Sequence, residues 1–84
     1  MAEEEKPEPY YGAWPCHPRD LVEEGVTTSA RRARIVLRKY VLGQDEEEIA
    51  EEEGISLKSV KYHLEKAEEE GLIDYVKEKF VEEE

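Results

Sequence analysis

Apolar side chains recur at helical spacing in the middle of the chain. Thr27, Thr28 and Ser29 are typical helix-capping residues. After them, five apolar side chains fall at positions i, i+3, i+4, i+7 and i+8: Ala33, Val36, Leu37, Tyr40 and Val41. Such spacing places them on one face of an α-helix, the face that would be buried. The pattern predicts a first long helix that begins near residue 28 and ends at Gly43.

Two more helices are predicted on either side of Gly54. Asp45 can cap the first of them, and the acids at 46–48 suit its first turn because the helix dipole favours negative charge there. Gly54 supplies the backbone freedom of a sharp turn, and Ser56 is a good N-cap for the helix that follows. That last helix is expected to run to about Glu70, with Gly71 as its C-cap.

The helix after Ser56 has two different faces. Four of its residues form an inward stripe: Val60, His63, Leu64 and Ala67. The opposite stripe is polar and carries two lysines, with Leu57, Lys58, Lys61, Tyr62 and Glu65. Two short helices joined by a tight turn, the second with a polar outer face, are the arrangement that places a helix in the DNA major groove.

The stretch DEEEIAEEEGISLKSVKYHL (45–64) resembles the helix-turn-helix of bacterial and archaeal regulators. VKYHLEKAEEEGLI is similar to winged-helix repressors of the ArsR and MarR kind, and SVKYH is similar to the LuxR/GerE family. The resemblance implies groove-facing positions at Ser56, Leu57, Lys58, Lys61, Tyr62 and Glu65. One departure is Glu53, which stands where these families usually have an apolar residue, so we expect it to weaken the packing or to lie at the edge of the core.

Both ends of the chain leave alternatives open. The segment YYGAWPCHP can be an extended arm that covers the core, or a strap that binds a partner through Tyr10, Tyr11 and Trp14. No metal site is expected at Cys16 and His17, since two adjacent residues cannot span a coordination sphere. Residues 72–81 fit a short terminal helix or a single strand better than a full β-wing. We therefore divide the chain into an acidic, partly disordered arm (1–27), a helix-turn-helix domain (28–81) and an acidic tail (82–84).

Charge is distributed unevenly along the chain. The formal net charge of −11 opposes binding to nucleic acid, but much of it lies in the terminal segments. The first long helix contains a basic run with no acid in it, which begins with Arg31 and Arg32. These arginines can contact DNA phosphates or pair with the acidic helix at 45–53.

Composition narrows the class of protein. Charged residues make up 42% of the chain, and no apolar run is long enough for a membrane span, so we expect a cytoplasmic protein without membrane contact. The bias toward Glu and against Asn and Gln is typical of thermophiles, and a salt-adapted cytoplasm would also favour acidic surfaces. We expect a prokaryotic or viral source. No catalytic motif or phosphate loop is present, so we predict neither an enzyme nor a cofactor.

The predicted fold is mostly α, a three-helix helix-turn-helix domain of winged-helix type, with the wing short or absent and an acidic N-terminal arm. The predicted function is DNA binding in transcriptional regulation: a homodimer would read the major groove of double-stranded DNA with the helix at 56–70. The alternative is a protein-interaction module that docks on a basic partner through its acidic surface and the YYGAW arm.

Overall fold

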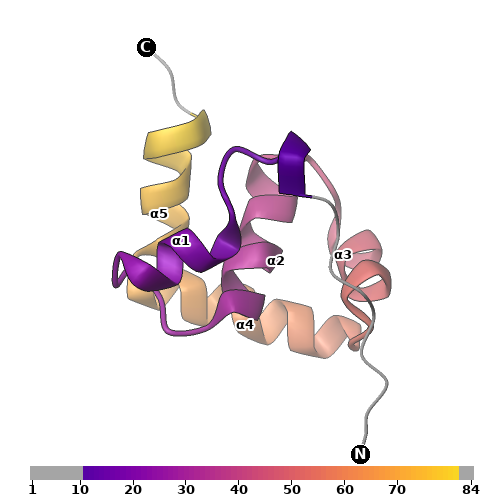
Figure 1. The fold of residues 1–84 in the computed structure, drawn as a ribbon. Helices are drawn as coiled ribbons and strands as arrows, with labels where there is room; N and C mark the ends of the chain where they lie inside the picture. The colour runs from indigo at the N-terminus through magenta and orange to yellow at the C-terminus, as the bar shows by residue number, and fades with distance from the viewer. Residues whose placement is uncertain (1–10, 82–84) are drawn as a thin grey trace, which may run out of the picture.

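The structure, a computed structural model, describes residues 11–81. Its elements in chain order are a 3₁₀ turn η1 (Tyr11–Ala13), α1 (Pro18–Glu23), α2 (Ala30–Tyr40), α3 (Glu46–Glu53), α4 (Leu57–Glu70), α5 (Leu72–Val76) and a π-helical turn η2 (Lys77–Val81) (Figure 1). No strand occurs in this part of the chain, so the mostly α fold is confirmed and residues 72–81 form no wing. None of the helices between residues 11 and 81 is long and apolar enough to cross a bilayer.

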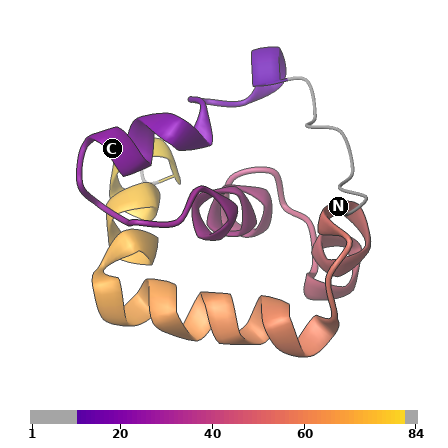
Figure 2. The ribbon, with the colours of Figure 1, turned by 60° about the horizontal axis from the view of Figure 1, so that its bottom comes forward.

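Helix α2 is the centre of the domain. Figure 2, which looks nearly along α2, shows α4 crossing on one side, α1 on the opposite side, and α3 and α5 flanking it. The side chains that fill the space between these helices are almost fully excluded from solvent: Leu21, Ile35, Val36, Leu37, Ile49, Val60, Leu72 and Val76. The buried stripes predicted for the long helices are confirmed, except that Tyr40, Val41 and His63 are only partly buried.

The predicted helix ends are formed by local hydrogen bonds. Asp45 and Glu48 make a capping box at the start of α3, and the hydroxyl of Ser56 accepts from the backbone N–H of Ser59 at the start of α4. Gly71 closes α4 with a φ of 82°, in the left-handed region that favours glycine. The first long helix ends earlier than expected, with Val41 as its C-cap.

Glu53 holds α3 against α2 through a buried ion cluster. Its carboxylate accepts from Arg34 at 2.9–3.0 Å and from Arg38 at 2.9 Å, and only 3% of its side chain is exposed. Burial lowers the pKa of Arg34, but the hydrogen bonds and charge of Glu53 outweigh that effect and leave the pKa above its ordinary value. The glutamate at the usual apolar position is therefore buried, and charge pairing replaces apolar packing there.

The described part of the YYGAWPCHP segment contacts this cluster through Trp14. Trp14 lies over the guanidinium of Arg38, with 5.2 Å from the ring centroid to Cζ, and Tyr11 meets Trp14 edge-on at 4.8 Å. Trp14 and Cys16 also pack against the apolar core. These contacts favour the interpretation of the arm as a cover for the core; Tyr10, the rest of residues 1–10 and the tail at 82–84 lie outside the described residues.

The C-terminal segment is a helix because one of its faces is buried. Leu72, Ile73 and Val76 of α5 are all buried, and α5 packs against α2. The hydroxyl of Tyr75 donates to Glu24, which ties the segment that follows α1 to α5. A strand here would have to pair with another strand, and residues 11–81 contain none.

We expect Glu53→Gln to lower the free energy of unfolding by about 3 kcal/mol, since it removes the carboxylate charge shared by the buried Arg38 and the part-buried Arg34 and leaves Arg38 only the exposed Glu52. Denaturant titration followed by circular dichroism measures this change. The matched control is Glu52→Gln, because Glu52 lies 3.6 Å from Arg38 but 57% of its side chain is exposed. The control should cost less than about 1 kcal/mol. Equal losses would mean that burial of the cluster has no energetic consequence.

Truncation of the arm's tryptophan should also destabilise the domain. We expect Trp14→Ala to lower the free energy of unfolding by about 2 kcal/mol, because it removes a part-buried ring and uncovers Arg38. Trp14→Phe keeps an aromatic face over Arg38 and should recover about half of that loss. A Trp14→Ala protein with the stability of the parent would show that the arm is not anchored by this contact.

Candidate nucleic-acid interface

The turn between α3 and α4 sets the position of the candidate DNA-reading helix. Gly54 has a φ of 73°, and the backbone N–H groups of Gly54 and Ile55 both donate to the carbonyl of Ala50, at 2.9 and 3.0 Å. This closure ends α3 within one residue and redirects the chain into α4. As a result, the first turns of α4 lie at the surface next to the start of α3 (Figure 2).

One face of α4 is open to solvent along its length. The residues that the sequence assigned to DNA contact lie exposed at its start and along this face: Ser56, Leu57, Lys58, Lys61, Tyr62 and Glu65. Tyr62 is 51% exposed and Leu57 36%, so both side chains are accessible to a partner. The structure thus brings these six predicted residues together, and their contact with DNA stays a prediction.

The lysines of this face differ from most other cations of the domain. Neither Lys58 nor Lys61 forms an ion pair with any residue in the range 11–81. The arginines of α2, by contrast, all pair with acids of α3 or α4. A negatively charged partner can therefore bind these two lysines without first breaking an ion pair within the domain.

Arg31 and Arg32, the other two predicted DNA contacts, are paired within the domain. Arg32 binds Glu70 at the end of α4 and donates through Nε to His63, and 14% of its side chain is exposed. Arg31 is 44% exposed and lies 3.9 Å from Glu53. Arg31 thus pairs with the acidic helix as the alternative predicted, whereas Arg32 pairs with an acid of α4 instead. A phosphate contact by either arginine stays a prediction.

His63 is a packed side chain between α2 and α4. Its Nδ1 accepts from Arg32 Nε at 3.3 Å, and its ring lies 5.7 Å from that of Tyr62. Desolvation lowers the pKa of His63 first, and the charges of Arg32 and Arg31 lower it further, against the opposing effect of Glu53. In the described part of the chain no three His, Cys, Asp or Glu side chains come together as metal ligands.

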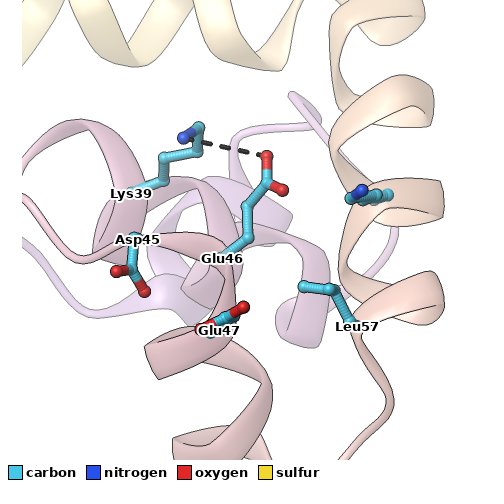
Figure 3. Close-up of a pocket in the computed structure, with 6 residues that line it drawn as sticks. Lys39, Asp45, Glu46, Glu47 and Leu57 are labelled. Atoms are coloured by element: carbon cyan, nitrogen blue, oxygen red, sulfur yellow. Dashed lines mark ion pairs between the residues drawn. The ribbon is translucent and has the colours of Figure 1, made fainter.

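A hollow opens beside the start of α4, where three helices meet. Its wall consists of Lys39 from α2, the residues Asp45, Glu46 and Glu47 at the start of α3, and Leu57 and Lys61 from α4 (Figure 3). Glu46 reaches toward Lys39 across the hollow, at 3.9 Å. Lys39 and the acids of α3 were not assigned to this site from the sequence, because only the crossing of α2 and α3 brings them next to α4.

The family model described as sigma-70, region 4, matches residues 29–70, which are 42 of the 84 residues. This chain belongs to the sigma-70 region 4 family. The match begins at Ser29, the N-cap of α2, and ends at Glu70, the last residue of α4, so it covers α2, α3 and α4. No curated protein and no solved structure shows a significant match to the chain.

Sigma-70 region 4 is a helix-turn-helix DNA-binding domain linked to transcription, and it is a non-enzymatic family. The predicted resemblance to helix-turn-helix DNA-binding proteins is therefore confirmed. The comparison gives no support to the ArsR, MarR or LuxR/GerE families in particular. The arm and α1 lie before the matched residues, and α5 lies after them.

The lowered pKa of His63 leads to a prediction about stability and pH. Because the folded pKa lies below the unfolded value of about 6.5, the unfolded chain binds more protons in that range. The free energy of unfolding should therefore fall as the pH drops from about 7.5 toward 5.5, and His63→Gln should flatten this slope. Urea titrations at a series of pH values measure both slopes. If the two proteins had the same slope, His63 would not be the titrating group.

Proposed function

We propose that this chain binds double-stranded DNA in transcription by placing the open face of α4 in the major groove. The observation that carries the proposal is that Lys58 and Lys61 stand exposed on this face without an ion pair among residues 11–81. Membership of a DNA-binding helix-turn-helix family supports the same role.

The side chains of this face have the chemistry that a groove requires. The two lysines can meet backbone phosphates or the acceptors of guanine, and the hydroxyl of Tyr62 can donate to a phosphate. Leu57 can contact the methyl group of thymine, and Ser56 and Glu65 can make polar contacts with base edges. In this proposal Leu57 and Glu65 contribute to sequence preference, and the lysines contribute most of the affinity.

The charge along α4 defines which part of it meets DNA. Its first half carries Lys58 and Lys61, whereas its second half exposes Glu65, Glu68 and Glu69. Phosphates are attracted to the first half and repelled by the second, so the helix should enter the groove by its N-terminal turns. With a formal net charge of −11 for the whole chain, binding should be weak and strongly dependent on salt.

A homodimer is part of this proposal, because a single short helix reads few base pairs and two copies would read two half-sites. The proposal also includes a cytoplasmic location, because transcription in a prokaryote takes place in the cytoplasm. Sedimentation velocity with and without DNA addresses the oligomeric state.

We expect Lys61→Glu to weaken binding to a mixed-sequence DNA duplex by about tenfold at roughly 50 mM salt and to reduce the salt slope by about one. Fluorescence anisotropy at several salt concentrations measures both quantities. Arg19→Glu is the matched control, since it makes the same change in net charge on α1, across α2 from α4 (Figure 2). The control should change affinity by less than about threefold.

Two results would contradict the proposal. Equal losses for Lys61→Glu and Arg19→Glu would mean that DNA senses only the net charge and that α4 is not the contact surface. Absence of measurable binding by the parent protein at the lowest salt would remove DNA as the ligand.

A further inference from the structure

The hollow beside α4 joins the proposed DNA-binding face. Leu57 and Lys61 belong both to the open face of α4 and to the wall of the hollow. Lys39 contributes a second cation from α2 (Figure 3). A DNA backbone that lies along the first turns of α4 therefore passes a hollow that holds these two lysines together with the acids Asp45, Glu46 and Glu47. A phosphate group there would be attracted by the lysines and repelled by the acids.

The two lysines differ in their partners. Lys61 has no ion-pair partner in the described range 11–81, whereas Lys39 lies 3.9 Å from Oε2 of Glu46. In Figure 3 the carboxylate of Glu46 points into the hollow toward Lys39, away from Asp45 and Glu47. The side chains of Lys39 and Glu46 remain 29% and 32% exposed, so solvent reaches the pair and it can open at low energetic cost.

We propose that Lys39 and Lys61 form a binding site for one DNA phosphate and that Glu46 competes with this phosphate for Lys39. In the free protein the carboxylate of Glu46 is the counter-charge of Lys39. When DNA binds, a phosphate oxygen replaces the carboxylate and Glu46 turns to solvent. A carboxylate of the chain itself thus competes with a DNA phosphate for Lys39 at the edge of the α4 face. This inference rests on the function proposed above.

Neutralisation of Glu46 should therefore increase DNA affinity by more than general electrostatics explains. We expect Glu46→Gln to tighten binding to a mixed-sequence duplex by about two- to fivefold more than the control, the range that an exposed ion pair allows. It should also steepen the salt slope by about one, because a free Lys39 gains a phosphate without losing a carboxylate. Fluorescence anisotropy at several salt concentrations measures both quantities.

The matched control is Glu47→Gln. Glu47 is the neighbouring residue in the first turn of α3, lines the same hollow and has no ion-pair partner among residues 11–81. Both substitutions remove one negative charge from the same helix turn, so the general reduction in repulsion should be similar. A thermal melt of each variant establishes that the two proteins are equally folded.

A double-mutant cycle tests whether the effect passes through Lys39. In the background of Lys39→Met, the change Glu46→Gln should give only the small gain of the Glu47→Gln control. If the protein binds DNA and Glu46→Gln and Glu47→Gln increase the affinity equally, the hypothesis that Glu46 competes with phosphate is wrong, while the proposed function remains intact. A gain for Glu46→Gln that persists in full without Lys39 would also overturn it. If neither the parent nor any variant binds DNA, the proposed function fails, and the inference fails with it.

Discussion

The contact of Glu53 with Arg34 and Arg38 is the constraint on which the geometry of the domain depends. α3 has eight residues, and its two apolar side chains, Ile49 and Ala50, are both buried. So short a helix with so little apolar surface has few contacts to fix its orientation. The bidentate pairing of Glu53 adds direction, because a guanidinium and a carboxylate bind only in a defined plane. The cluster therefore adds a directional contact to the apolar packing of Ile49 and Ala50 where α3 meets α2.

The same cluster explains how the acidic chain distributes its cations. The arginines of α2 are used inside the domain, on Glu53 and Glu70, where partial burial reduces screening by salt. Two lysines on the exposed face of α4, Lys58 and Lys61, remain without acids of the described chain. The open face of α4 therefore presents two cations that pair with no acid among residues 11–81, even though the molecule as a whole is strongly negative. This separation allows a net charge of −11 and DNA binding to exist in one protein.

The segments outside the matched region complete the core around α2. Trp14 covers Arg38, Leu21 of α1 is buried, and Leu72 and Val76 of α5 close the remaining side. The helix-turn-helix by itself would leave these faces of α2 open to water. Because the arm and the last helix cover them, the domain buries its apolar surface without using the face of α4 that is proposed for DNA.

The sequence by itself determined the local structure. Helical periodicity, the caps Ser29, Asp45 and Ser56, and the glycines at 54 and 71 specify where α2 begins and where α3 and α4 begin and end, because these signals act within a few residues of the chain. The open face of α4 was predictable for the same reason, since one helix has one buried stripe and the opposite residues are exposed.

Only the tertiary structure decided the contacts between distant residues. It placed Glu53 inside the arginine cluster, turned Arg32 toward Glu70, and brought Lys39 and Glu46 to the edge of the α4 face. It also decided that residues 72–76 form a helix, because the apolar pattern of this segment fits a helix or a strand and the contact with α2 determines which residues are buried. Charged side chains are long and can pair in several ways, so their partners depend on which helices cross and at what angle. A periodic pattern gives the buried face of each helix, but it does not contain that angle.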